Sequence, residues 1–297
     1  MKWNAEAEAA GERRRVFCAS LADVFEKWTG NVHRAGGFLW HRDDIGICSA
    51  GQTTAQNVRG ERLATLNDVR RRLFTEILNT PWLDWLLLTK RPENIISALQ
   101  DVIRDEVGDS CLSLMVQGWL RGDAPSNVWL GTSCENQAAA DERIPHLLKV
   151  PAVVRFLSCE PMLGPVDLKK IAVPRDEDQL RRAWDIDGYK FNCLTEHDDD
   201  RFHQPPATIG WVIVGGESGP GARPMRLAWV RSLTNQCRSA GVPCFVKQLG
   251  GNMHDDDADE INRAGFVVHD RKGGNCDEWP TEFRVRDFPI GKDVAHA

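Results

Sequence analysis

The chain has 297 residues, of which 42% are hydrophobic and 27% charged, a composition too apolar for a disordered protein. A net charge of -6 argues against a surface built mainly to hold nucleic acid, although it leaves room for a local basic cleft. Nine cysteines are an odd number, so a fully paired disulfide framework is excluded. No stretch approaches the ~20 apolar residues of a membrane helix, and we expect reduced thiols and a cytoplasmic protein with no membrane partner.

The predicted elements begin with a helix in the charged, alanine-rich segment MKWNAEAEAAGERRR. Six short apolar runs that follow along the chain predict strands, at Val16–Ala19, Trp85–Thr89, Val128–Thr132, Val153–Ser158, Trp211–Gly215 and Cys244–Lys247. Their apolar residues are continuous rather than alternating, which is typical of strands covered on both faces in a parallel sheet.

Helical stretches separate several of these runs. Apolar residues recur at helical spacing from Leu63 to Ile77, and Pro92 occupies the position of a first-turn proline. A third helix starts near Leu227 and ends at Gly241, the residue type that favours the left-handed conformation at a helix C-terminus. The alternation of strand and helix predicts right-handed crossovers and an α/β fold.

Polar residues directly after five strands distinguish between the two architectures that fit, an open doubly wound sheet and a barrel. Sites built from the carboxyl ends of many successive strands are typical of (β/α) barrels, whereas an open sheet concentrates them at one switch point. We therefore predict an incomplete (β/α) TIM-like barrel of about six parallel strands within residues 1–250. A loop or cap at 28–56, a polar insertion at 169–208 and a C-terminal extension at 251–297 fall outside the alternation.

The segment GGESGPGARP, from Gly215 to Pro224, is the most informative motif. Glycines after a strand let a ligand approach the backbone and leave amide N–H groups free. Glu217 is suited to hold an ammonium or a ribose hydroxyl, and Arg223 a carboxylate or phosphate. The alternative is a tight strand-to-helix loop with solvated charges.

Charged residues at the other strand ends have two interpretations each. Glu160 is a candidate base or cation ligand, or else one half of an ion pair at the rim of the sheet. Lys90 and Arg91 form an anion site, or are two solvated cations. The remaining strand-end residues, which either face the same mouth or have structural roles such as helix capping, are Ser133, Glu135, Lys247 and Gln248.

No metal site is predicted from the cysteines and histidines. Cys18, Cys134 and Cys159 lie in or just after predicted strands, where buried thiols are commoner than ligands. The group of Cys193, His197 and His203 matches no standard zinc spacing, and the acidic run at 255–257 lacks the glycine and glutamate of a calcium loop.

Five segments resemble, in the same order, a phage-associated family of gene products 37 and 68, the domain of unknown function 5131: VFCASLADVFE, WLLLTKRPENI, NVWLGTSCENQAAADERIPHLL, VRFLSCEPMLGPVDL and WVIVGGESGPGARPM. That family looks like a relative of the radical S-adenosylmethionine enzymes, whose fold is an incomplete (β/α) barrel. The resemblance therefore implies S-adenosylmethionine as cofactor. It also implies a [4Fe–4S] cluster, held in family members by three clustered cysteines of an N-terminal segment.

This chain contains no Cys-x-x-Cys motif, so the cluster ligands cannot be carried over to any of its residues. We expect the first barrel strand and the cluster loop to be missing, through truncation or loss. The next strand is then left with an unpaired edge, which favours poor soluble expression. By its motif matches, the resemblance implies a cofactor and substrate cavity lined by Glu217, Ser218, Arg223, Glu160, Lys90 and Arg91, without assigning individual roles. Our own expectation is a cofactor site at Gly215, Gly216, Glu217, Ser218 and Arg223, catalytic roles for Glu160 and Lys90, and a substrate cavity lined by Asp23, Arg91, Ser133, Glu135, Lys247 and Gln248.

Three functional hypotheses follow. The full-length parent is a radical enzyme acting on a small molecule, a nucleotide or nucleic acid, for which this chain itself is expected to be inactive. The second hypothesis is a binding barrel that has kept its cavity without redox chemistry. The third is a cluster-independent enzyme, in which Glu160 or Glu217 acts as acid or base while Lys90 polarises an anionic, nucleotide-like substrate.

Overall fold

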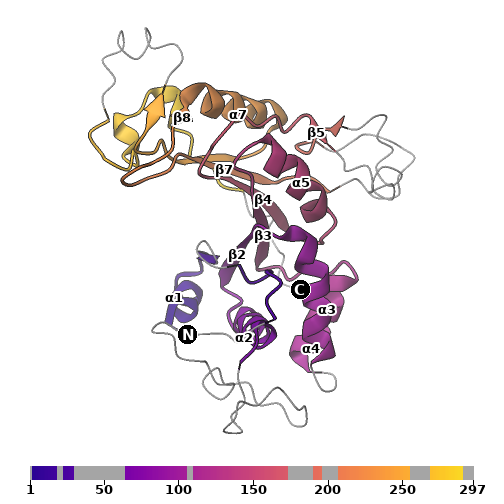
Figure 1. Ribbon diagram of the computed structural model, residues 1–297. Coiled ribbons are helices and arrows are strands. Elements are labelled where there is room, and N and C mark those ends of the chain that lie inside the picture. Colours follow the sequence, from indigo (N-terminus) through magenta and orange to yellow (C-terminus); the bar gives the residue numbers. More distant parts are fainter. Residues whose placement is uncertain are drawn as a thin grey trace, which may run out of the picture. The chain divides into compact units, whose positions relative to one another are not determined.

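The computed structural model describes residues 2–18, 23–29, 64–105, 110–172, 190–195, 207–254 and 268–289 (Figure 1). Six main strands coincide with the six predicted runs, and each ends within one residue of its predicted end. They are β1 (Arg14–Cys18), β2 (Leu83–Thr89), β3 (Val128–Ser133), β4 (Val154–Cys159), β7 (Trp211–Gly215) and β9 (Cys244–Gln248).

These strands form one sheet in the order β1-β2-β3-β4-β7-β9, which is also their order along the chain. The pairs β1–β2, β4–β7 and β7–β9 are parallel. A doubly wound sheet reverses its strand order at a switch point, and no such reversal occurs in this order. The topology is thus compatible with the predicted incomplete (β/α) barrel.

The helices of the described chain are α1 (Lys2–Ala10), α2 (Leu66–Leu78), α3 (Ile95–Arg104), α4 (Cys111–Leu120), α5 (Gln137–Leu148) and α7 (Leu227–Ala240). As predicted, the chain leaves α7 at Gly241 in the left-handed conformation, with φ 68°. Pro92 begins the short 3-10 helix η2 (Pro92–Asn94), and α3 starts only after it. The predicted proline position therefore belongs to a 3-10 turn rather than to the α-helix itself.

Short elements complete the described fold. The two-residue strands β5 (Ile171–Ala172) and β6 (Lys190–Phe191) pair antiparallel, and β8 (Met225–Arg226) pairs parallel with β10 (Met253–His254). Two 3-10 helices, η3 (Cys276–Glu278) and η4 (Thr281–Phe283), follow near the C-terminus. Within the described residues, no helix combines the length and the apolar character needed to cross a membrane.

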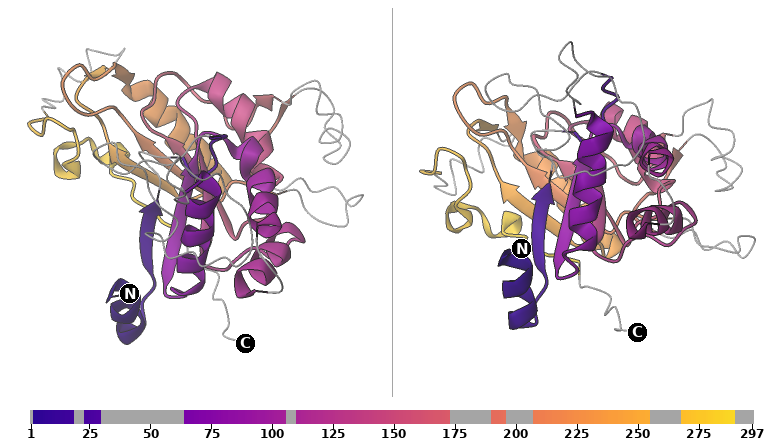
Figure 2. Two further views of the ribbon diagram at one scale, coloured as in Figure 1. Left: turned by 60° about the horizontal axis from the view of Figure 1, so that its bottom comes forward. Right: turned by 90° about the horizontal axis from the view of Figure 1, so that it is seen from below.

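The chain divides into two compact units, each with its own core. Unit 1 comprises residues 1–129 and 150–153, and unit 2 comprises residues 130–149 and 154–297. In unit 1, α3 and α4 lie side by side (Figure 2), and the rings of Phe74 and Trp119 pack edge to face at 5.9 Å. In unit 2, the buried rings of Phe156 and Trp211 lie 5.9 Å apart. Large buried aromatic rings of this kind account for much of the apolar area that stabilises each unit.

The C-terminal part of unit 2 lies along β9. The amide of Val246 donates to the carbonyl of Val285 at 2.8 Å, and the amide of Asp287 donates to the carbonyl of Cys244 at 2.8 Å. The Trp211 indole donates to the Asp287 carbonyl at 2.9 Å. This segment therefore uses backbone groups of β9 that the β7 pairing leaves available.

Several predicted segments lie outside the described residues. They are positions 30–56 of the expected loop or cap, 173–189 and 196–206 of the polar insertion, and the acidic run at 255–257. His197 and His203 fall in the same category, whereas Cys193 is described and buried.

Candidate functional site

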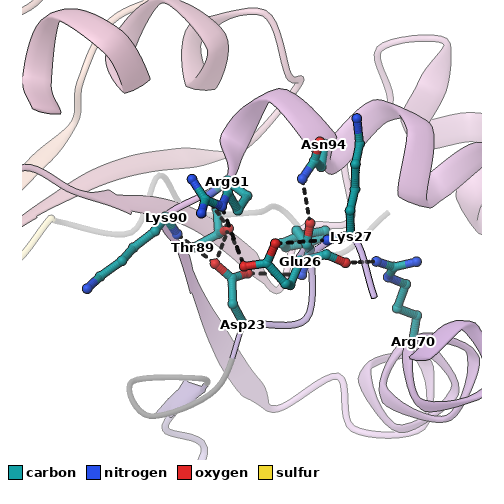
Figure 3. A network of polar contacts seen from close by, with 9 residues as sticks. Asp23, Glu26, Lys27, Arg70, Thr89, Lys90, Arg91 and Asn94 are labelled. Carbon is teal, nitrogen blue, oxygen red and sulfur yellow. Dashed lines mark hydrogen bonds and ion pairs between the residues drawn. The ribbon is translucent and has the colours of Figure 1, made fainter. Parts of the chain in front are cut away.

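Asp23 organises the first group of polar residues, at the carboxyl end of β2 in unit 1 (Figure 3). Its carboxylate accepts the Thr89 hydroxyl at 2.7 and 2.9 Å, the Lys90 amide at 2.8 Å and the Phe25 amide at 3.0 Å. The segment that begins at Asp23 is therefore fastened directly to the end of the strand. Asp23 was predicted as a cavity residue, and here it serves as an anchor between two chain segments.

Arg70 and Asn94 hold the same segment from two other elements. The Arg70 guanidinium, on α2, donates to the carbonyls of Val24 at 2.7 Å and Glu26 at 2.8 Å, while the Asn94 amide, on η2, donates to the Phe25 carbonyl at 3.0 Å. Burial lowers the pKa of Arg70, partly offset by the charge of Asp101. Three buried side chains, including the fully buried Phe25 ring, thus position this turn.

Three cationic side chains, those of Lys27, Lys90 and Arg91, lie around the turn, and they differ in whether they form an ion pair. Arg91 lies 3.4 Å from the Glu26 carboxylate, and its amide donates to the Thr89 hydroxyl at 2.8 Å. Glu26 also accepts the backbone amide of Lys27 at 3.1 Å. The ammonium groups of Lys27 and Lys90 have no partner among the described residues, and both side chains leave the network in Figure 3.

Glu160 and Lys247 form the first charged pair of unit 2. Both carboxylate oxygens of Glu160, directly after β4, lie 3.0 Å from the Lys247 Nζ on β9. A Cβ at Gly215, on the intervening strand β7, would lie 3.2 Å from the Glu160 side chain. The glycine therefore leaves the space in which the carboxylate reaches across β7. The expected ion pair at the rim of the sheet is present, with Lys247 as the cation.

Glu217 and Arg223 form the second pair, within the loop after β7. The Arg223 guanidinium donates to the two Glu217 oxygens at 2.7 and 3.0 Å, and the Arg223 amide donates to the same carboxylate at 2.9 Å. These hydrogen bonds lower the pKa of Glu217 to about 2 and raise that of Arg223. The loop thus presents a carboxylate and a guanidinium side by side and both ionised.

Glycines in this loop serve close backbone packing. The Gly216 amide donates to the Gln248 carbonyl at 3.0 Å, and the Gln248 side chain donates back to the Gly216 carbonyl at 2.7 Å. A Cβ at Gly216 would lie 2.4 Å from the Leu249 carbonyl oxygen, and one at Gly273 would lie 2.5 Å from that of Gly250. The expectation that the glycine amides are free for a ligand is therefore wrong at Gly216, because another chain segment occupies the position.

Backbone hydrogen bonds join the strand ends of unit 2 into one rim. The Leu163 amide donates to the Glu135 carbonyl at 2.7 Å, and the Met162 amide donates to the Gly215 carbonyl at 2.8 Å. The segment after Glu160 therefore connects the end of β3 to the end of β7. Ser218, the remaining predicted residue of this loop, is exposed.

Arg143 belongs to the same rim and was not predicted from the sequence. Its guanidinium, on α5, donates at 2.8 Å to both the Glu135 carboxylate and the Ser133 carbonyl. Asn136 caps α5 by accepting the Ala139 amide at 3.0 Å, so neither Ser133 nor Glu135 is the cap. The signal available in the sequence is Asn136, which fixes the start of a helix and places Arg143 two turns along it.

The buried thiols of unit 2 do not form a metal site among the described residues. Burial raises the pKa of Cys134, Cys159 and Cys193 above the ordinary thiol value. Neutral thiols of this kind pack as small apolar side chains rather than acting as ligands or nucleophiles.

A family model described as a protein of unknown function (DUF5131) matches residues 61–280. No curated protein and no solved structure matches the chain.

Proposed function

Because the chain belongs to the DUF5131 family, whose function is unknown, we propose its function from the rim of unit 2: binding of a small ligand that carries an α-amino-acid group, as S-adenosylmethionine does. The observation that carries the proposal is the bidentate Glu217–Arg223 pair on the glycine loop after β7. An α-amino acid is a zwitterion, and a carboxylate beside a guanidinium offers a complementary partner to each of its charged groups.

The Glu217–Arg223 pair is available to a ligand. Arg223 and Glu217 retain 53% and 32% side-chain exposure, and exposed ion pairs stabilise a protein little, so opening the pair costs little. Glu217 is ionised at every physiological pH, because its pKa is about 2 within the pair and the ordinary value of 4.5 for the open pair also lies below that range. An ammonium ligand requires this charge. The packing of Gly216 against the Leu249 backbone fixes the loop in advance, which lowers the entropic cost of binding.

The Glu160–Lys247 pair supplies further polar contacts on the same unit. The Glu160 side chain is 18% exposed and the Lys247 side chain 54% exposed, so the lysine is the more accessible partner of the pair. We assign Lys247 to an anionic group of a second ligand or substrate, with Gln248 next to it on β9. Ser218, exposed in the loop after β7, is a further candidate contact. Lys90, Arg91 and Asp23 lie in unit 1, and the proposal is built on residues of unit 2.

The residues of this chain do not fit a [4Fe–4S] cluster. Such a cluster needs thiolates close together, whereas the sequence has no Cys-x-x-Cys motif and the described residues hold no group of three metal-binding side chains. The buried thiols also have raised pKa values. No step is therefore assigned through a cluster. We also propose that the family is related to the radical S-adenosylmethionine enzymes, and the strand order of the sheet supports this relationship. A phage role for the family is part of the same proposal.

Calorimetric titration with S-adenosylmethionine tests the proposal. We expect binding, with Glu217→Gln and Arg223→Gln each lowering the affinity about tenfold or more, because each removes one charged partner of the amino-acid group. Adenosine lacks that group. We therefore expect its affinity for the wild-type protein to be no higher than the affinity of S-adenosylmethionine for the variants.

A matched control is available in the same unit. Arg231 and Glu282 form another bidentate pair, with distances of 2.9 and 3.1 Å, on α7 and η4. Glu282→Gln and Arg231→Gln remove the same charges without touching the loop and are expected to leave the affinity unchanged. Absence of binding to the wild-type protein, or equal effects in both pairs, would contradict the proposed site.

A further inference from the structure

Asn252, between β9 and β10, contacts the loop that carries the Glu217–Arg223 pair. Its side-chain amide donates to the Ala222 carbonyl at 2.9 Å, and Ala222 directly precedes Arg223 in the chain. Its backbone carbonyl accepts the Met225 amide at 2.9 Å. The half-buried Asn252 therefore holds the loop backbone on both sides of Arg223.

The residue before Asn252 holds the other half of the pair. The Gly251 amide donates to the Glu217 carbonyl at 2.8 Å. Consecutive Cα atoms are about 3.8 Å apart, so these two neighbouring residues fix the separation between the backbones that carry the carboxylate and the guanidinium. A Cβ at Gly251 would lie 3.0 Å from the Arg271 carbonyl oxygen, which shows that this dipeptide is itself packed against the C-terminal segment.

His254 determines which end of the Asn252 side chain faces the loop. Its Nε2 lies 2.8 Å from the Asn252 Oδ1. The Ala222 carbonyl can only accept a hydrogen bond, so the NH2 group of Asn252 must face it and Oδ1 must face His254. His254 Nε2 then carries a hydrogen and donates it to Oδ1. The two contacts together give the Asn252 amide a single favourable orientation.

The loop between Glu217 and Arg223 depends on such contacts for its shape. Gly219 and Gly221 within it have φ values of 101° and 77°, and glycine restricts the backbone less than any other residue. The Arg223 amide and guanidinium reach the Glu217 carboxylate at 2.9 and 2.7 Å, which requires one position of the Arg223 backbone. Hydrogen bonds from outside the loop therefore decide how often the pair is formed.

We infer that Asn252 is a positioning residue of the proposed ligand site, which acts on Arg223 through the loop backbone rather than by touching the ligand. This inference rests on the proposed function, because it concerns the same Glu217–Arg223 pair. It assigns the placement of the pair to one side chain outside the glycine loop, and that side chain can be removed without changing any charge.

Titration of the Glu217 carboxyl by ¹³C NMR in Asn252→Ala tests the inference without a ligand. The substitution keeps the backbone bond to Met225, so β10 is expected to stay paired with β8. We expect the Glu217 midpoint to rise from about 2 towards the ordinary 4.5, because the donors of Arg223 are no longer held in position. Calorimetry should show about fivefold weaker binding of S-adenosylmethionine, as expected for one lost neutral hydrogen bond.

Two further variants distinguish positioning from a general loss of stability. Asn235→Ala makes the same truncation on α7, where Asn235 accepts from Arg238 at 2.9 Å, and should leave the Glu217 midpoint at about 2. His254→Ala removes only the group that orients the Asn252 amide, and should raise the midpoint less than Asn252→Ala does. It also keeps the test possible if Asn252→Ala does not fold. Far-UV circular dichroism and the midpoint of thermal unfolding check that each variant is folded.

Each outcome bears on the inference. A Glu217 midpoint that rises in Asn252→Ala and not in Asn235→Ala supports it. An unchanged midpoint in folded Asn252→Ala, or an equal rise in Asn235→Ala, would overturn it. So would a rise with unchanged S-adenosylmethionine affinity, because the pair would then be displaced without effect on the ligand. If the midpoint rises as expected but the wild-type protein binds no S-adenosylmethionine, Asn252 positions the pair and the proposed function fails instead.

Discussion

At the scale of single residues, charged side chains of this molecule are held by direct hydrogen bonds to oppositely charged groups. Glu217 is the clearest case, because three donors from Arg223 converge on its carboxylate and lower its pKa to about 2. A carboxyl whose pKa is lowered in the folded state favours folding above its ordinary pKa, and that contribution is lost as the pH falls towards the folded value. The pair therefore persists in mild acid and opens only near pH 2.

Titration of the Glu217 carboxyl by ¹³C NMR measures this effect. We expect a midpoint at about pH 2 in the wild-type protein and a return towards the ordinary 4.5 in Arg223→Gln, because the guanidinium donors are removed. Arg231→Gln, which alters the pair with Glu282, is the control and should leave the Glu217 titration in place. A Glu217 midpoint near 4.5 in the wild-type protein would show that the pair is not formed in solution.

At the scale of elements, strands could be predicted and some helices could not. The main strands are continuous apolar runs, because both faces of each strand are buried. Such runs can be recognised in the sequence without knowing which strands they pair with. Helix α4, CLSLMVQGWL, is apolar nearly all round and so lacks a periodic face. Helix α5 carries opposing signals, because Asn136 marks its start whereas Pro145 within it argues against a helix. Both helices form because tertiary packing outweighs these local signals.

The candidate site residues differ in the same way in what the sequence could predict. Glu160, Glu217 and Lys247 lie at strand ends as expected, since their positions follow from where each strand stops. Their partners could not be predicted, because pairing depends on the strand order. Lys247 contacts Glu160 because β4 and β9 flank β7, and Gly215 leaves the gap between them.

Packing between β3 and β4 gives a test at this scale. A Cβ at Gly131 would lie 2.3 Å from the ring of Phe156, which is fully buried and packed on Trp211. The ring has no room to move, so we expect Gly131→Ala to lower the free energy of unfolding by about 1–3 kcal/mol, as overpacking does. Urea unfolding measures the change.

Two further variants make the test specific. In the Phe156→Leu background the same alanine should cost much less, because the smaller side chain removes the clash and makes the two changes non-additive. Gly118→Ala, in helix α4, meets only an ordinary 3.7 Å contact and should be neutral or slightly stabilising. Equal destabilisation at positions 118 and 131 would contradict the proposed packing.

At the scale of the whole molecule, segments far apart in the sequence meet through glycines rather than side chains. Gly216 after β7, Gly250 after β9 and Gly273 near the C-terminus approach so closely that a Cβ on any of them would lie within 2.9 Å of another backbone. The Leu249 amide also donates to the Gly273 carbonyl at 2.8 Å. No hydrophobic period marks such contacts, which is why a sequence reading assigns the glycines to loops or to a ligand.

Gly273→Ala tests whether the C-terminal segment holds the loop of the candidate site. The new Cβ would lie 2.5 Å from the Gly250 carbonyl oxygen, and the backbone at position 273 has φ 59°. Gly241→Ala is a matched control, because Gly241 has φ 68° but nothing within 4 Å of its Cβ position. Both variants carry the left-handed strain of about 1–2 kcal/mol, and the clash at position 273 is expected to add about 1–3 kcal/mol to the destabilisation. Hydrogen exchange should then show faster exchange at the Leu249 and Gly216 amides in Gly273→Ala alone, since these donors lose their fixed acceptors. Similar exchange in the two variants would mean that the C-terminal segment does not position the loop.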